Sequence, residues 1–540
     1  MWARNLLFFA VSLTGLVALG ASLFRQVESN QEHPRRTISD EQREGIRLVA
    51  SSIDAAMAAK WQEEGLTPAG PADELTVIRR LALALVGTTP SLEEIRWLER
   101  LPADQQFEAY LDALFADRRY SDYMAERLVR PLVGVEQGPF LVYRRRRFVS
   151  WMADQLYENR RYDAVIRDCL ASDGIWTAQP ATNFVTVSLQ QDKNNLPDVD
   201  KLAGRVCRAV LGVRLDCAQC HDHPFASWEQ NDFQGLAAFY GRTKLELTGL
   251  KDNGEPHEFD IHATGETKAV EPSVPYAAEL LPKTGPVRER LAIWVTHEQN
   301  KAFARATANR MWAFMFGRAL VEPVDDISID GPHPETLNLL ADDFAASGHD
   351  LQRLVRIIAA TQAFQADSRA AEDSELTPRH AAEWAAFPIS RLRPEQAVGG
   401  VLQSASLTTI DYDSHIITRI TRATSEQDFV KRYGDAGVDE LEDATGTVTQ
   451  RLLMLNGNLV AEKTKNDMIN NAATRIARLA PTDEKAIETA YLATLTRRPN
   501  PEELSHFTSQ LKGTTGEYRI DVLCDLYWAL INSTEFSWNH

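Results

Sequence analysis

The chain has 540 residues, of which 44% are hydrophobic and 25% are charged. This composition excludes a disordered or collagen-like chain, and the length predicts more than one domain. The formal net charge of -18 argues against a nucleic-acid partner, because binding phosphates requires a basic surface.

The first 25 residues predict export and a membrane anchor. Arg4 precedes an apolar run from Leu6 to Phe24 that is about long enough to span a bilayer as a helix. A cleaved signal peptide would begin in the same way, but Arg4 favours a retained anchor with its start in the cytoplasm. We therefore expect the body of the protein in the periplasm or cell envelope, held at the inner membrane.

Residues 26–45 are polar and without periodicity, which is typical of a tether between a membrane anchor and a folded body. Helical patterns then dominate residues 46–243. Within them, Ser91 stands three residues before Glu94, ahead of apolar positions, and this spacing predicts a capping box at the start of a helix.

The pattern changes over residues 244–286, which are punctuated by glycine and proline. The alternation from Glu258 to His262 suits a small β-hairpin or an extended linker, and we place a domain boundary in this segment. Helical patterns return over residues 287–540. The sequence thus predicts a mostly α protein: an N-terminal membrane-anchor helix and two helical domains joined by a small β-containing or extended linker.

Two segments far apart in the chain have similar sequences. LALVGTTPSLEEI (83–95) and LATLTRRPNPEEL (492–504) align without gaps, and each describes a helix, a turn with proline and a capped second helix. Two helical hairpins of similar design are therefore expected, although chance explains the likeness equally well.

The segment CAQCHDHPF (217–225) carries the strongest chemical signal. Cys217, Cys220 and His221 form C-x-x-C-H, the attachment sequence for c-type haem. Cysteines three residues apart lie on one helical face and can bond one porphyrin edge, while the adjacent histidine can reach the iron as proximal ligand. The predicted export agrees with this interpretation.

The same segment permits two other interpretations. Cys217, Cys220, His221 and His223 offer four nitrogen and sulfur donors to zinc or iron without haem, and Asp222 could orient an imidazole. Alternatively, the two cysteines form a C-x-x-C disulfide with a purely structural role. The chain has five cysteines, so they cannot all pair within it.

Several longer stretches resemble a known family. GVRLDCAQCHDHPFASWEQNDFQGLAAFY resembles the signature of the planctomycete cytochrome-c-like domain of uncharacterised cell-envelope proteins. FARATANRMWAFMFGRALVEPVDD, HPETLNLLADDFAASGHDLQRLVRIIAATQAFQ and LYWALINSTEFSWNH resemble its companion planctomycete C-terminal domain. The resemblance implies a two-domain architecture over residues 50–540 and a cytochrome-like label, but no established reaction.

A bound haem would leave its second axial position open. The candidates are two methionines and four histidines: Met311, Met315, His257, His262, His297 and His333. Met311 and Met315 have the pattern of a helix core. His333 is the preferred distal ligand, because it lies in a proline-bounded loop before a helix.

Three functional hypotheses follow. The first is an envelope protein with haem c, working in electron transfer or redox catalysis with an unidentified redox partner. The second is a metal-dependent enzyme or scaffold that uses the cysteine–histidine cluster without haem. The third is a module that binds an envelope polymer without catalysis. The sequence leaves open whether the protein is an enzyme.

Overall fold

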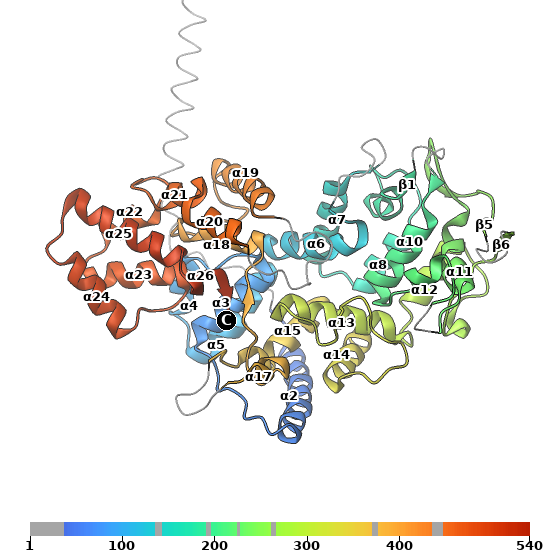
Figure 1. Ribbon diagram of the computed structural model, residues 1–540, viewed down its shortest axis with the longest axis horizontal. Helices are drawn as coiled ribbons and strands as arrows, with labels where there is room; N and C mark the ends of the chain where they lie inside the picture. The colour runs from blue at the N-terminus through green and yellow to red at the C-terminus, as the bar shows by residue number, and fades with distance from the viewer. Residues whose placement is uncertain are drawn as a thin grey trace, which may run out of the picture.

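The computed structural model describes residues 37–135, 143–190, 196–223, 227–260, 266–369, 376–434 and 447–540. Within these ranges the chain is mostly helical, as predicted (Figure 1). None of the helices in this part of the chain is both long and apolar enough to cross a membrane. The predicted anchor, residues 1–25, lies outside the described residues.

The helices up to residue 241 are α2 (Asp40–Glu63), α3 (Glu74–Val86), α4 (Leu92–Leu98), α5 (Ala103–Ala116), α6 (Arg118–Val133), α7 (Arg145–Tyr157), α8 (Tyr162–Ala171), α9 (Asn183–Thr186), α10 (Val199–Arg205) and α11 (Gln230–Gly241). Those from residue 287 to 404 are α12 (Val287–Val295), α13 (Lys301–Phe316), α14 (Glu335–Ala346), α15 (Leu351–Ala360), α16 (Gln362–Gln365), α17 (Pro378–Ala382) and α18 (Pro394–Ser404). The remaining helices are α19 (Ile416–Tyr433), α20 (Val448–Asn456), α21 (Asn458–Thr464), α22 (Ala472–Leu479), α23 (Asp483–Leu495), α24 (Pro501–Leu511), α25 (Gly516–Ile531) and α26 (Thr534–Ser537).

Short antiparallel strand pairs are the only sheets in the described residues. β1 (Leu189–Gln190) pairs with β2 (Leu196–Pro197), and β7 (Ser390–Arg391) pairs with β8 (Trp538–Asn539). The segment predicted to contain strands forms two pairs, β3 (Thr243–Glu246) with β4 (Gly249–Asp252) and β5 (His257–Asp260) with β6 (Thr267–Val270). The prediction of a small β-containing segment is confirmed.

Helix caps form where the sequence predicts them. The Ser91 hydroxyl accepts a hydrogen bond from the Glu94 amide, and the Glu94 carboxylate accepts one from the Ser91 amide. Asn500 and Glu503 make the same reciprocal pair at the start of α24. These bonds satisfy amides that an uncapped helix would leave without partners.

The buried apolar residues form two main cores. The first runs from Ile46 to Phe387 and includes residues from α2 to α16 and from the segment that follows α17. The second gathers residues from Leu392 to Phe536 and also takes in Leu83 of α3. In Figure 1 the helices of the second core, α18–α26, lie at one end, and α8 and α10–α12 lie at the other. Helices on both sides of the predicted boundary segment therefore share the first core.

The two similar segments form two helical hairpins that pack against each other. Leu75, Ile95 and Leu492 make a small buried cluster between α3, α4 and α23. Arg498 pairs with Glu99 across this contact. The predicted pair of hairpins is thus confirmed.

A glycine fixes the turn of the first hairpin. Gly87 ends α3 with a φ of 68°, a left-handed conformation that glycine adopts without strain. A Cβ atom at this position would lie 2.4 Å from the Tyr123 ring. The turn therefore requires both the backbone freedom and the small size of glycine.

Two buried arginines of α3 hold distant parts of the chain. Arg80 is fully buried; its Nη1 donates to the carbonyls of Phe364 and Ala366, at 2.8 and 2.7 Å, and its Nε donates to the main-chain oxygen of His540 at 2.8 Å. Its guanidinium also lies 3.7 Å from the centre of the Phe387 ring. The neighbouring Arg79 donates to main-chain oxygens of α23 and α26. Helix α3 therefore joins the two cores through side-chain to main-chain bonds.

Replacing Arg80 by methionine should destabilise the protein by about 3 kcal/mol, because buried main-chain oxygens from three positions lose their donor. Urea unfolding followed by circular dichroism measures the change. Arg432→Met is the matched control; Arg432 is more than half exposed and pairs with Asp428, so its loss should change stability by less than about 0.5 kcal/mol. Equal unfolding midpoints for the two variants would contradict the role assigned to Arg80.

Candidate functional site

The C-x-x-C-H motif lies on the surface, between the π-helical turn Val206–Leu211 and α11. A short 3-10 helix, Asp216–Gln219, carries Cys217 and ends just before Cys220. Both cysteines are exposed and have free thiols, whereas Ala218 between them is fully buried. A 3-10 helix has three residues per turn, which places residues three apart on the same face. The buried Ala218 thus anchors the segment and both thiols face solvent.

His221 has a defined ring orientation. Its Nδ1 lies 2.7 Å from the carbonyl oxygen of Asp222. Because a carbonyl can only accept, Nδ1 carries the proton in this contact and the lone pair of the neutral ring is on Nε2. The Asp222 carboxylate accepts a hydrogen bond from the Gln230 amide at the first residue of α11. Asp222 therefore orients the imidazole through its main chain and ties the motif to α11 through its side chain.

A buried polar network holds the motif from beneath. Gln234 of α11 is 3% exposed, and its Nε2 donates to the Gln219 carbonyl at 3.1 Å. The Gln219 side chain donates in turn to the Asp200 carboxylate at 3.1 Å. His257 of β5 donates from Nε2 to the Gln234 amide oxygen at 2.7 Å. Residues from α10, α11 and β5 thus fix the position of Gln219, between the two cysteines.

Burial shifts the pKa values of the two ionisable groups in this network. It lowers the pKa of His257 below its ordinary value, and the nearby Asp200 carboxylate opposes this effect. It raises the pKa of Asp200 above its ordinary value, while hydrogen bonds from Gln219 and Gln234 oppose the rise. From the sequence, His257 was predicted only as one of several candidate ligands, and Asp200 and Gln234 were not predicted. Gln230 and Gln234 are four residues apart on a mostly apolar helix, so they lie on the same face of α11. This spacing is the sequence signal from which a polar face on α11 could have been predicted.

The predicted bare-metal donors do not converge in this structure. His223 uses its main-chain amide to bond the Trp228 carbonyl at 2.8 Å. In the part of the chain that the structure describes, no three His, Cys, Asp or Glu side chains are grouped so that they could hold a metal ion. Binding of zinc or iron by Cys217, Cys220, His221 and His223 stays a prediction that this structure does not test.

The other candidates for an axial ligand lie in varied surroundings. Met311 and Met315 are buried in α13 within the first core, as their pattern predicts. His297 accepts a hydrogen bond from the Gln299 amide just after α12. His333 lies in the segment before α14, where burial and the nearby Arg305 lower its pKa. Its Nε2 is buried and has no hydrogen-bond partner within the described residues. His262 lies outside the described residues.

Comparison with protein families gives two matches. Residues 52–245 match the PSCyt2 model, described as a protein of unknown function (DUF1549), and residues 287–511 match the PSD1 model, described as a protein of unknown function (DUF1553). The two matches, in this order along the chain, support a planctomycete-type two-domain family, and both models are described as of unknown function. The C-x-x-C-H motif falls in the PSCyt2 match and His333 falls in the PSD1 match. Searches of curated proteins and of solved structures each found no match.

The exposure of the cysteines predicts their reactivity. In reduced chain made without haem, two of the five thiols should react rapidly with a disulfide reagent such as DTNB at pH 8, namely the exposed Cys217 and Cys220. Burial raises the pKa of Cys169 and Cys207 far above the ordinary value and that of Cys524 to about 11, so these three stay protonated. The thiol count is read from absorbance.

A Cys217→Ser/Cys220→Ser double variant should lose the rapid phase, and unfolding in guanidinium should release the three slow thiols. Cys524→Ser is the control and should leave the rapid phase unchanged. A rapid phase that survives the double substitution would contradict the assignment.

Proposed function

We propose that this protein is a cell-envelope c-type haem protein that works in electron transfer or redox catalysis. Haem c would be attached through Cys217 and Cys220, with His221 as the proximal ligand of the iron. The observation that carries the proposal is the orientation of His221: its Nδ1–H donates to the Asp222 carbonyl and leaves Nε2 available to a metal, beside two exposed free thiols. A metal-binding histidine generally has its other ring nitrogen bonded in this way.

The chemistry of the donor set fits the group. Covalent attachment requires two thiols that a porphyrin edge can approach, and both thiols face solvent. The bonds from Gln234 and to Asp200 hold Gln219 between the thiols, so the motif has a defined position against α10 and α11. When bound, the haem iron supplies a one-electron redox couple. An exposed attachment site would bring that couple close to a redox partner, either a protein or a small molecule.

His333 remains the proposed distal ligand. A buried imidazole nitrogen without a hydrogen-bond partner loses free energy unless a ligand satisfies it, and Nε2 of His333 is such an atom within the described residues. Its lowered pKa keeps the ring neutral near pH 7, which is the form that binds metals. Ligation by His333 would join the PSCyt2 and PSD1 regions through the iron.

Zinc or iron bound without haem is less well supported. Such a site needs three or four side chains to converge, and within the described residues these donors are not so grouped. Attachment to a haem needs only the two thiols and one imidazole. The envelope location and the inner-membrane anchor are part of the proposal and are supported by the apolar run from Leu6 to Phe24.

The proposal predicts a covalent haem in protein made by a host that matures cytochromes c. A denaturing gel stained for haem peroxidase should show a band at the mass of the chain, and a pyridine haemochrome spectrum should show one c-type haem. Cys217→Ser and Cys220→Ser should each reduce covalent haem severely. His221→Ala should change the spectrum of any haem that is still attached, because it removes the proximal ligand.

His223→Ala is the matched control and should keep a full complement of haem. Elemental analysis of the same preparations distinguishes the alternatives. Stoichiometric zinc or iron without porphyrin, lost on His223→Ala, would replace the haem proposal with the bare-metal hypothesis. Folded protein that contains neither haem nor metal would contradict both.

A further inference from the structure

A second feature lies away from the cysteine motif, at the junction of the two hydrophobic cores. A cleft of about 1990 Å³ opens between α4, α5 and α7 on one side and α18, α19 and the loop 406–415 on the other. Sites for single small molecules usually have volumes of about 300–1,000 Å³. The cleft is therefore large enough for an extended ligand.

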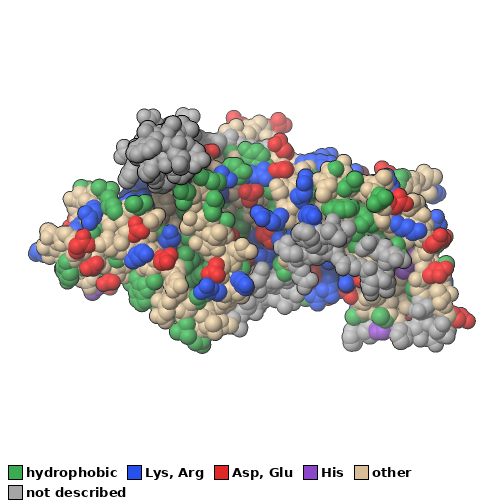
Figure 2. Space-filling model, turned by 90° about the horizontal axis from the view of Figure 1, so that it is seen from above, with side chains coloured by type: hydrophobic (Ala, Val, Ile, Leu, Met, Phe, Trp, Pro, Cys, Tyr) green, Lys and Arg blue, Asp and Glu red, His purple; other side chains and the backbone are tan. Residues whose placement is uncertain are grey.

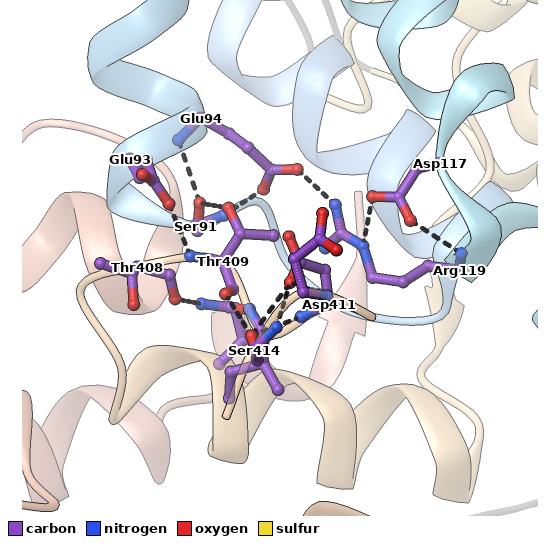
Figure 3. A network of polar contacts seen from close by, with 12 residues as sticks. Ser91, Glu93, Glu94, Asp117, Arg119, Thr408, Thr409, Asp411 and Ser414 are labelled. Atoms are coloured by element: carbon purple, nitrogen blue, oxygen red, sulfur yellow. Dashed lines mark hydrogen bonds and ion pairs between the residues drawn. The ribbon is translucent and has the colours of Figure 1, made fainter. Parts of the chain in front are cut away.

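The loop 406–415 is fixed to the opposite wall. The Glu93 carboxylate accepts a hydrogen bond from the Thr409 amide at 2.9 Å, and the Ser91 and Thr409 hydroxyls lie 2.8 Å apart (Figure 3). Within the loop, Asp411 accepts hydrogen bonds from the amide and the hydroxyl of Ser414. These bonds give the cleft a preformed shape, which lowers the entropy lost when a ligand binds.

A buried ion cluster forms part of the lining. Arg119 has a side chain only 8% exposed, and it bonds the carboxylates of Glu94 and Asp117, each at 2.7 Å (Figure 3). One positive charge thus lies between two negative ones. Such a cluster positions hydrogen-bonding groups firmly but offers no excess positive charge to an anion.

The charges that line the cleft nearly balance as a set, with six Asp or Glu residues against seven Lys or Arg residues, and several of them are paired. Arg118 pairs with Asp122 and Asp154, and Arg96 pairs with Glu99. Figure 2, which views the molecule from above relative to Figure 1, shows acidic and basic side chains interspersed over the visible face. A surface with interspersed charges of both signs attracts neither a polyanion nor a polycation strongly.

Two exposed tyrosines supply aromatic surface from opposite walls. Tyr157 at the end of α7 is 39% exposed, and Tyr412 of the loop is 61% exposed. The guanidinium of Arg419 lies 4.0 Å from the centre of the Tyr412 ring and covers one face of it. Serine and threonine residues line the same cleft, including Ser150, Thr418 and Thr421. Flat apolar faces beside many hydrogen-bonding groups match the alternation of C–H faces and hydroxyls on a sugar ring.

We propose that this cleft binds a neutral, hydroxyl-rich chain, that is, an oligosaccharide or a stretch of a neutral polysaccharide, with Tyr412 and Tyr157 as stacking surfaces. The cleft is large enough for several linked sugar units. Its nearly balanced charge favours an uncharged ligand. Its lining contains both aromatic rings and hydroxyl groups that can form hydrogen bonds with a sugar. This site does not depend on a haem, and its test reads no haem signal.

Isothermal titration calorimetry of the full chain against chitohexaose, cellohexaose and maltohexaose tests the proposal. At least one of these neutral hexasaccharides should bind, and the dissociation constant should change less than about twofold between 50 and 500 mM NaCl, because no ion pairs form. Tyr412→Ala should weaken binding by about tenfold, and Tyr157→Ala should also weaken it. Circular dichroism confirms that the variants are folded.

Tyr518→Ala is the matched control, because Tyr518 is 66% exposed on α25 and does not line the cleft. This variant should bind as the unmodified chain does. Failure of all three hexasaccharides to bind would overturn the proposal. Binding that Tyr412→Ala and Tyr157→Ala leave unchanged would overturn the site. Steeply salt-dependent binding of polygalacturonate without any binding of the neutral sugars would assign the cleft to a polyanion instead.

Discussion

The guanidinium of Arg80 lies where three distant lengths of chain meet. It bonds main-chain oxygens that are 284, 286 and 460 residues further along the sequence, and it stacks on Phe387. These bonds offset part of the cost of burying the cation, and they tie α3 to the chain around Phe364 and to the last residues. The PSCyt2 and PSD1 regions consequently depend on each other.

Local chemistry explains why part of the fold could be predicted from the sequence. The capping boxes at Ser91 and Asn500 use residues three apart, so the whole interaction is present in a short stretch. The helical hairpins followed from the same kind of signal, and the short strands followed from the punctuated segment before residue 287. The C-x-x-C-H motif can be recognised in the sequence. Its position on an exposed 3-10 helix could not be predicted.

The contacts that define the sites depend on residues far apart in the sequence. Gln234 looked like one polar residue on an apolar helix until Gln219 and His257 were placed beside it. Arginine is usually exposed, yet both Arg79 and Arg80 are buried, because their main-chain partners come from distant parts of the chain. The family matches leave residues 246–286 between them, whereas the hydrophobic cores divide near residue 390. A change in composition marks a change in local structure, but it does not say which helices will share a core.

If haem c is attached to Cys217 and Cys220, their exposed position means that the two thiols would have to be kept reduced before attachment. Two solvent-facing thiols three residues apart tend to oxidise to a disulfide in the compartment where haem c is attached. A disulfide has no thiol left to bond a porphyrin, so oxidation and cofactor loading compete for the same two sulfur atoms. Under the proposed function the chain would need a reductant before haem could be attached, and the amount of loaded protein in a cell would depend on the supply of electrons to the envelope as well as on the supply of porphyrin.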